Sequence, residues 1–67
     1  MPGPWQTRAK LLFGDALFKQ GEYKRAKEIY IVVRKGTTGD DKAAATKKIV
    51  ACNAALGLND RDGITGP

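Results

Sequence analysis

The segment GDALFKQGEYKRAKEIY, Gly14 to Tyr30, contains two runs of helix-forming residues separated by a single glycine. Glycine just past the end of a helix can adopt a left-handed conformation without the steric penalty of a Cβ atom. We therefore expect one helix to end at Gln20, just before Gly21, and the next to begin at Glu22. A connection this short makes the two helices antiparallel neighbours.

The spacing of apolar residues predicts helices on both sides of this turn. The first is expected over residues 7–20, with Thr7 as a candidate N-cap. Its inward face has the spacing i, i+4, i+7, i+11 and comprises Ala9, Phe13, Ala16 and Gln20, widened by Leu12 and Leu17. The second is expected over residues 22–35, with an inward face at Tyr23, Ala26, Tyr30 and Val33. Ile29–Val33 is rich in β-branched residues and would also suit a strand, but the helical period spans the whole segment.

A third helix is expected over residues 41–56, because its apolar residues repeat with the same spacing at Ala45, Ile49, Cys52 and Leu56. Thr38 and Asp41 before it resemble a capping box, although Glu or Gln usually stands at the second position. Gly36 and Gly57 are expected to close the second and third helices in a left-handed conformation, as Gly21 closes the first.

The two ends of the chain differ in composition from these helices. Pro2, Gly3 and Pro4 predict an irregular N-terminal arm over residues 1–6. The Asn, Asp and Gly residues of 58–67 predict an irregular tail. The sequence therefore predicts an all-α fold, an antiparallel helical hairpin with a third packed helix, over residues 7–57.

The hairpin segment resembles the tetratricopeptide repeat, a helix–turn–helix unit of about 34 residues with the signature W-x2-L-G-x2-Y, then A-x3-F, then P. The chain reads Lys10-x2-Phe13-Gly14-x2-Leu17 and then Ala26-x3-Tyr30. The resemblance is close over about residues 7–35 and weak over 42–57, which resembles the first helix of an incomplete second repeat. Lys10 in place of Trp and Leu17 in place of Tyr suggest a terminal or isolated repeat. Thr38 in place of Pro implies a lengthened connection.

The resemblance implies a role for each matched position. It implies a repeat core of Phe13, Gly14, Leu17, Gly21, Tyr23, Ala26 and Tyr30. Within it, Gly14 would allow the second helix to approach closely, and Tyr30 would fill the wedge towards a following repeat. It also implies an inner groove lined by Leu11, Asp15 and Phe18 of the first helix and by Lys47 and Ala51 of the third. Because Asp15 would repel a carboxylate, a clamp for C-terminal carboxylates is not expected.

Further apolar residues point to a partner. Trp5, outside the repeat, is expected either to cover an apolar edge of the hairpin or to anchor a partner. One hairpin with one extra helix leaves a flank that a neighbouring repeat would otherwise bury. The candidates for this flank are Leu11 and Phe18 on the first helix and Ile31 and Val32 on the second. We expect the chain to self-associate or to bind another protein through them.

The residue types offer little for catalysis. The 67 residues include no histidine, the side chain best suited to proton transfer near neutral pH. Cys52, the only cysteine, stands late in its helix on the apolar face and is interpreted as a small buried hydrophobe rather than a nucleophile. No glycine-rich phosphate-binding motif occurs. We expect no enzyme activity, no cofactor and no metal.

Twelve Lys and Arg against seven Asp and Glu give a formal charge of +5. Several of the cations gather around the second helix, at Lys19, Lys24, Arg25, Lys27, Arg34 and Lys35. Such a surface suits an acidic protein or nucleic-acid phosphates. The leading interpretation is a protein–protein interaction module, an adaptor or assembly subunit alone or within a longer array. The alternative is a small basic helical module that binds nucleic acid through the second helix.

The chain also carries few targeting signals. No apolar run reaches the roughly 18 residues that a membrane span needs, and the N-terminus lacks a signal-peptide pattern. A lone thiol suits a reducing compartment. These features predict an intracellular protein of the cytoplasm or nucleus.

Overall fold

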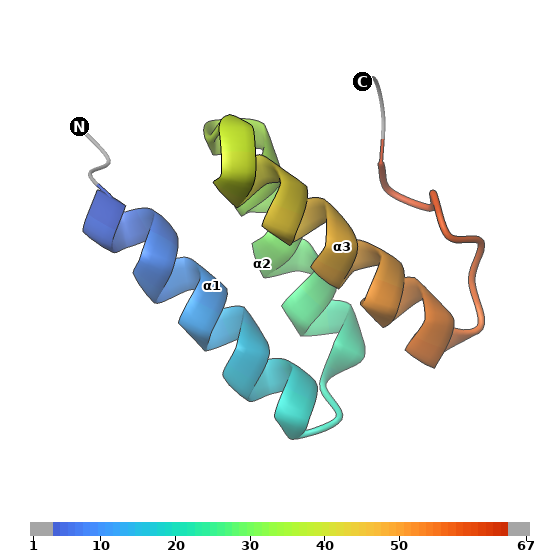
Figure 1. Ribbon diagram of the computed structural model, residues 1–67. Coiled ribbons are helices and arrows are strands. Elements are labelled where there is room, and N and C mark those ends of the chain that lie inside the picture. The colour runs from blue at the N-terminus through green and yellow to red at the C-terminus, as the bar shows by residue number, and fades with distance from the viewer. Residues whose placement is uncertain (1–3, 65–67) are drawn as a thin grey trace.

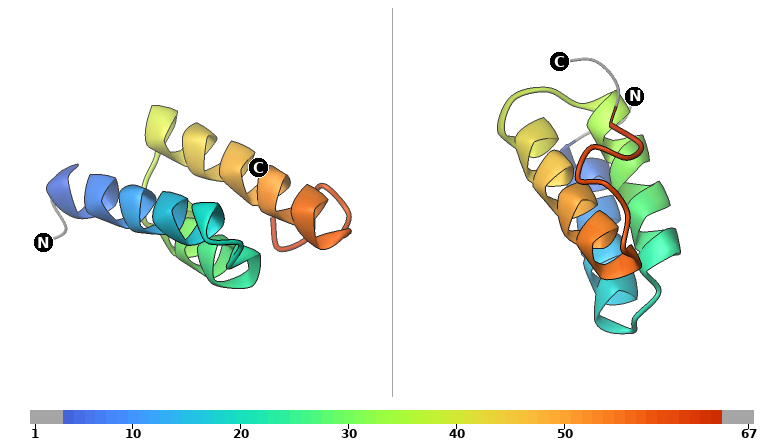
Figure 2. Two further views of the ribbon diagram at one scale, coloured as in Figure 1. Left: turned by 90° about the horizontal axis from the view of Figure 1, so that it is seen from below. Right: turned by 90° about the vertical axis from the view of Figure 1, so that its right-hand side faces the viewer.

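Three helices account for most of residues 4–64, the part of the chain that the computed structural model describes. They are α1 (Pro4–Lys19), α2 (Tyr23–Gly36) and α3 (Gly39–Leu56). Successive helices run antiparallel, and α1 and α3 lie in front of α2 (Figure 1). The two rotated views in Figure 2 show the same arrangement, with α2 packed against both partners while α1 and α3 touch each other little. The predicted all-α fold, a hairpin with a third packed helix, is confirmed.

The first helix begins earlier than the sequence predicted. It starts at Pro4, so residues 4–6 are helical rather than part of an irregular arm, and Thr7 lies inside the helix rather than at its N-cap. Proline suits this position because the first backbone N–H groups of a helix have no intrahelical acceptor. Residues 1–3 of the predicted arm lie outside the described residues.

The turn between α1 and α2 is formed around Gly21, as predicted. Its φ of 81° is in the left-handed region. The Gly21 N–H donates to the carbonyl of Phe18 at 3.0 Å, and the Glu22 N–H donates to the carbonyl of Leu17 at 2.9 Å. This pair of hydrogen bonds satisfies carbonyl groups at the end of α1 and helps to reverse the chain within the three residues between Lys19 and Tyr23.

The connection from α2 to α3 differs in detail from the prediction. Gly36 does not close α2 in a left-handed conformation: it is the last residue of the helix, and Thr37 is the C-cap in an extended conformation. Thr38 is the N-cap of α3, as predicted, but its side chain makes no capping hydrogen bond, so the expected capping box does not form. α3 begins two residues earlier than predicted, at Gly39.

The core lies where α2 contacts the other two helices and the tail. Its buried apolar residues are Leu17, Ala26, Tyr30, Val33, Ala45, Ile49, Cys52 and Ile64. The predicted inward faces of α2 and α3 are therefore largely correct, although Tyr23 and Leu56 are only half-buried. Near the hairpin turn, Tyr23 packs edge-to-face on Phe18, with ring centroids 4.9 Å apart.

The predicted inward face of α1 is wrong. Its members Ala9, Leu12, Phe13, Ala16 and Gln20 are all exposed. The exception is Leu17, which the prediction included and which is buried on the same side as Gly14, with Leu11 and Phe18 half-buried against the core. Apolar residues lie on both faces of α1, so the period of the sequence did not distinguish the face that meets α2 from the one that meets solvent.

Gly14 of α1 lies directly against the ring of Tyr30 on α2. A Cβ atom on Gly14 would be 2.6 Å from Cε1 and 2.9 Å from Cζ of Tyr30. Real Cβ atoms do not approach ring carbons so closely, so the buried Tyr30 ring occupies the space a side chain would need. This geometry agrees with the expectation that Gly14 leaves no room for a side chain, with the Tyr30 ring as the opposing group.

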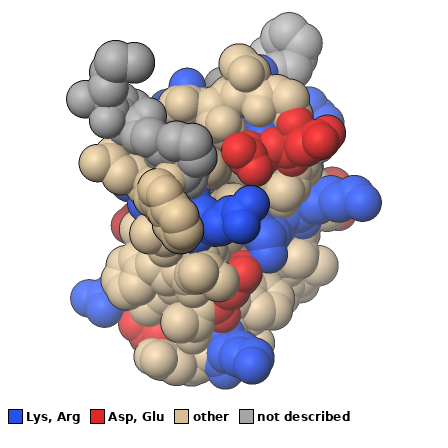
Figure 3. Space-filling model, turned by 60° about the vertical axis from the view of Figure 1, so that its left-hand side comes forward, with Lys and Arg blue, Asp and Glu red and all other residues tan. Residues whose placement is uncertain are grey.

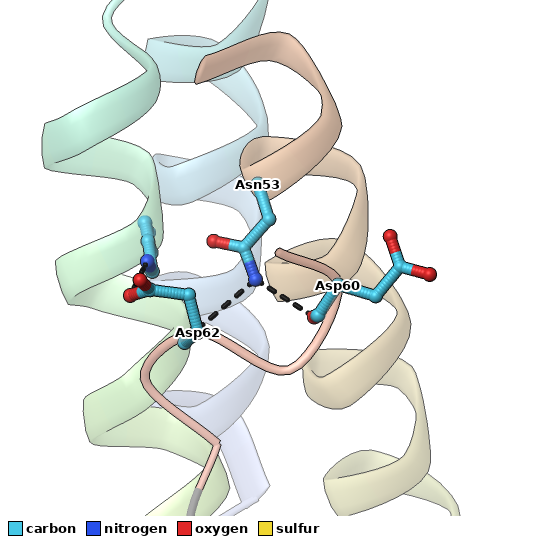
Figure 4. A network of polar contacts seen from close by, with 4 residues as sticks. Asn53, Asp60 and Asp62 are labelled. Atoms are coloured by element: carbon cyan, nitrogen blue, oxygen red, sulfur yellow. Dashed lines mark hydrogen bonds and ion pairs between the residues drawn. The ribbon is translucent and has the colours of Figure 1, made fainter. Parts of the chain in front are cut away.

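The tail after α3 packs back on the helices. Ile64 is only 7% exposed and belongs to the core cluster. The buried Asn53 side chain on α3 donates to the backbone carbonyls of Asp60 at 2.8 Å and Asp62 at 3.0 Å. Lys27 on α2 pairs with Asp62 at 2.8 Å (Figure 4). Residues 58–64 contain no helix or strand, as predicted, yet they complete the core; residues 65–67 lie outside the described part.

Candidate functional site

A groove of about 360 Å³ opens between α1 and α3 above α2. It is lined by Asp15, Phe18, Lys19, Tyr30, Lys48 and Ala51. The Tyr30 hydroxyl at its floor donates to the Asp15 carboxylate. Lys48 of α3 donates to the same carboxylate at 2.7 Å, and its ammonium lies 5.6 Å from the centroid of the Tyr30 ring. These contacts connect all three helices through Asp15.

The electrostatics of this groove are set by the same three side chains. Burial tends to raise the pKa of Asp15, but hydrogen bonds from Lys48 and Tyr30 outweigh it and hold the pKa below its ordinary value. Burial, and then the hydrogen bond to Asp15, raise the pKa of Tyr30. At neutral pH the groove therefore contains a carboxylate whose charge is balanced by Lys48.

The sequence predicted this groove in part. Asp15, Phe18 and Ala51 line it, whereas Leu11 is half-buried against the core beside it. Lys47 does not join them and lies on a different surface; its neighbour Lys48 takes the predicted place. One residue along a helix is a rotation of about 100°, and the weak resemblance in α3 did not fix that rotation. The signal for Lys48 was its spacing from Ala45 and Cys52, which both face the interior.

The opposite face of α1 is a second candidate surface. Three large side chains on this face are exposed: Trp5 to 82%, Leu12 to 64% and Phe13 to 56%. The smaller Ala9 and Ala16 on the same face are also exposed. The spacing i, i+4, i+7, i+8, i+11 places all five on one side of the helix, and we call them the outer α1 stripe. In Figure 3, which turns the left-hand side of Figure 1 towards the viewer, uncharged side chains make up much of the surface, with charged side chains between and around them.

The outer α1 stripe corrects two predictions. Phe13, expected in the repeat core, lies on the outside of the hairpin. Trp5 does not cover an apolar edge, because its side chain is itself almost fully exposed on the first turn of α1. The other role predicted for Trp5, anchoring a partner, stays a prediction.

The predicted flank on α2 is partly closed by the tail. Ile31 is half-buried, and its Cδ1 atom lies 3.2 Å from the position a Cβ on Gly63 would take. Val32 is exposed. The flank is partly closed because Gly63 and Ile64 pack on α2 and α3. The composition of the tail did not predict this packing.

The cations of the second helix do not form one stripe. Lys27 and Arg34 are buried, Lys27 against Asp62 and Arg34 with its Nε donating to the Thr46 hydroxyl at 3.0 Å. Arg25 forms an exposed ion pair with Glu22, with 3.5 Å between Nη1 and Oε2. Of the cations predicted to gather around the second helix as a possible nucleic-acid contact, Lys27 and Arg34 are therefore not part of an exposed basic face, whereas Lys24, Arg25 and Lys35 are exposed.

Cys52 is fully buried, as predicted, and burial raises the pKa of its thiol. Within residues 4–64, no cluster of three or more His, Cys, Asp or Glu side chains could hold a metal ion. None of the helices in this part of the chain is both long and apolar enough to cross a membrane.

Comparison of the chain with protein-family models, with curated proteins and with solved structures finds no match.

Proposed function

We propose that the chain is a protein-interaction module of the tetratricopeptide type, which binds a partner helix along the outer α1 stripe. The observation that carries this proposal is the exposure of Trp5, Leu12 and Phe13 on one side of one helix. Clustered exposed apolar residues are typical of protein-binding surfaces, and Trp is enriched among the residues that dominate binding energy.

The shape of the stripe suits a helix. Trp5 to Ala16 spans eleven residue steps, or roughly 16 Å at about 1.5 Å per residue. Ala9 and Ala16 leave depressions between the larger side chains, into which the ridges of a second helix can pack. The resemblance of the hairpin to a tetratricopeptide repeat adds to this, since such repeats bury their flanks against neighbouring helices.

The size of the stripe limits the affinity that it can supply. A fully buried aromatic side chain contributes roughly 150–250 Å², so the exposed fractions of Trp5 and Phe13 together correspond to roughly 200–350 Å². At about 25 cal/mol per Å² this is roughly 5–9 kcal/mol, similar to the roughly 4–15 kcal/mol that association costs. Tight binding would therefore need Leu12 and polar contacts at the margin as well.

Charge favours a particular kind of partner. The charged residues of α1 beside the stripe, Arg8 and Lys10, are basic, as is Lys19 at the edge of the groove between α1 and α3. One acidic residue of α2, Glu28, lies near Phe13. Asp15, the only acidic residue of α1, lines the groove between α1 and α3 and pairs there with Lys48. Two copies of the chain joined through this face would bring like charges together, whereas a helix with acidic margins would complement them. The proposed partner is therefore an acidic amphipathic helix of another protein.

The alternative function, nucleic-acid binding through the second helix, has less support. Lys27 is buried against Asp62 of the tail, and Arg34 is largely buried with its Nε on Thr46 of α3, so neither belongs to an exposed basic face of α2. Tyr30 is in the core and Tyr23 packs on Phe18, so neither ring presents a free face for a base to stack on.

Affinity capture with matched variants tests the proposal. We would compare the wild type, Leu12→Ser with Phe13→Ser, and the control pair Val32→Ser with Leu58→Ser, whose residues are also exposed but lie off α1. Proteins captured by the wild type and the control but lost with the α1 pair would be partners of the stripe. Circular dichroism would establish that all three remain helical. Capture that is indifferent to the α1 pair would remove the basis of the proposal.

A further inference from the structure

A second groove, of about 450 Å³, lies at the other side of the fold, where α2, α3 and the tail meet. Its lining comprises Arg34, Gly39, Lys42, Ala43, Thr46, Lys47 and Arg61. Four of these residues are cationic and none is acidic, and they come from three different segments of the chain. We call it the basic groove; it shares no residue with the outer α1 stripe.

The floor of the basic groove is formed by α3. Gly39, Ala43 and Thr46 have the spacing i, i+4, i+7 and therefore lie on one side of the helix. They are small, so a ligand can approach the helix backbone closely. At about 100° per residue, Lys42 and Lys47 fall on opposite sides of this floor. The two ammonium groups can therefore reach a ligand from both edges.

The other two cations are positioned by contacts within the fold. Arg34 is buried on α2, and its Nε donates to the Thr46 hydroxyl, which in turn donates to the carbonyl of Lys42. Arg61 is brought to the groove by the tail, because Asn53 holds the carbonyls on either side of it, those of Asp60 and Asp62 (Figure 4). The packing of the tail thus completes the groove.

The balance of charge around the groove indicates the size of the ligand. Among residues 4–64, no Asp or Glu lies within ion-pair distance of Lys42, Lys47 or Arg61. Lys42, Lys47 and Arg61 come from α3 and the tail and line one groove of about 450 Å³. A compact anion held in this groove can therefore contact all three cations together.

We propose that the basic groove binds a single phosphoryl group, carried on a phosphorylated side chain of a protein. A phosphoryl group is compact, has a charge of about −1.5 to −2 at neutral pH and offers three strong acceptor oxygens. Converging Arg and Lys donors match it with charge-assisted hydrogen bonds. The open groove leaves room for the peptide on either side. This site is independent of the proposed function, so either can fail without the other.

Titrations followed by amide NMR shifts test this site with three probes. The probes are a glycine peptide containing one phosphoserine, its unphosphorylated serine twin, and a short DNA duplex. We expect saturable shifts at Gly39, Ala43 and Thr46 with the phosphopeptide and none with the serine peptide. Lys47→Gln with Arg61→Gln should weaken phosphopeptide binding about tenfold or more, because two of the four cations are lost.

The control pair is Lys10→Gln with Lys24→Gln, which removes the same charge from exposed residues outside the groove. It should change the affinity by less than about twofold, since distant exposed charges are largely screened. Equal losses from both pairs, or the absence of saturable shifts, would overturn the proposal. So would duplex DNA that binds more tightly than the phosphopeptide, with a salt dependence of several phosphates.

Discussion

Replacing Gly14 with alanine tests the packing of the hairpin. The added methyl group would lie 2.6 Å from Cε1 of Tyr30, so α1 or the ring must move. Such overpacking costs about 1–3 kcal/mol, while Ala in place of Gly within a helix gains about 0.5–1 kcal/mol. We therefore expect a net loss of up to about 2.5 kcal/mol in the free energy of unfolding. At roughly 4–8 °C per kcal/mol in a domain this small, the melting temperature should fall by several degrees.

Gly36→Ala is the matched control for this variant. Gly36 ends α2 without a positive φ, and no atom lies within 4 Å of the position its Cβ would take. The same chemical change should there be neutral or slightly stabilising. Thermal and urea unfolding followed by circular dichroism would measure both variants. A Gly14→Ala chain that melts at or above the wild type would refute the close approach of α1 to Tyr30.

Three further predictions concern the core and the inner groove. The folded-state pKa of Asp15 lies below its ordinary value of 3.8. The stabilising contribution of Asp15 is therefore fully present above pH 3.8 and is lost as the pH falls towards the lowered pKa. In an acid titration, Asp15→Asn should lose less stability over this range than the wild type. Ile64→Ala should cost about 2–4 kcal/mol in urea unfolding because Ile64 is buried, whereas Leu58→Ala, at an exposed tail position, should cost within about 0.5 kcal/mol. Cys52 is fully buried, so its rate of labelling by a thiol reagent should follow opening of the fold and should rise in Ile64→Ala; labelling as fast as that of a free thiol in the native wild type would contradict its burial.

The helices could be predicted from the sequence because each carries a strong local signal. Gly21 marks the reversal, and α2 and α3 each have one apolar face, so the period gave both their existence and their orientation. The strand-like run Ile29–Val33 was correctly assigned to a helix because its residues continue the period of α2.

The orientation of α1 could not be read from its period, because apolar residues occupy both of its faces. A local signal did exist: Gly14 was expected against the second helix, and Ala16 lies on nearly the opposite side of a helix from it. The two expectations were incompatible, and the geometry favours Gly14. The packing of the tail depends on Asn53 and Ile64. One side chain is polar and the other apolar, and no sequence motif or periodicity links them. The basic groove depends on that packing, so the sequence did not predict it.

Site-specific photo-crosslinking in cells tests the central claim, that the outer α1 stripe docks a partner, most directly. Phe13 would be replaced by p-benzoylphenylalanine, which keeps an aromatic ring at an exposed position, and Val32, exposed on α2, would be replaced in the same way as the control. We predict a discrete adduct of higher mass from position 13 that Leu12→Ser reduces, and no such adduct from position 32. The same adducts from both positions, or none from position 13, would contradict the account.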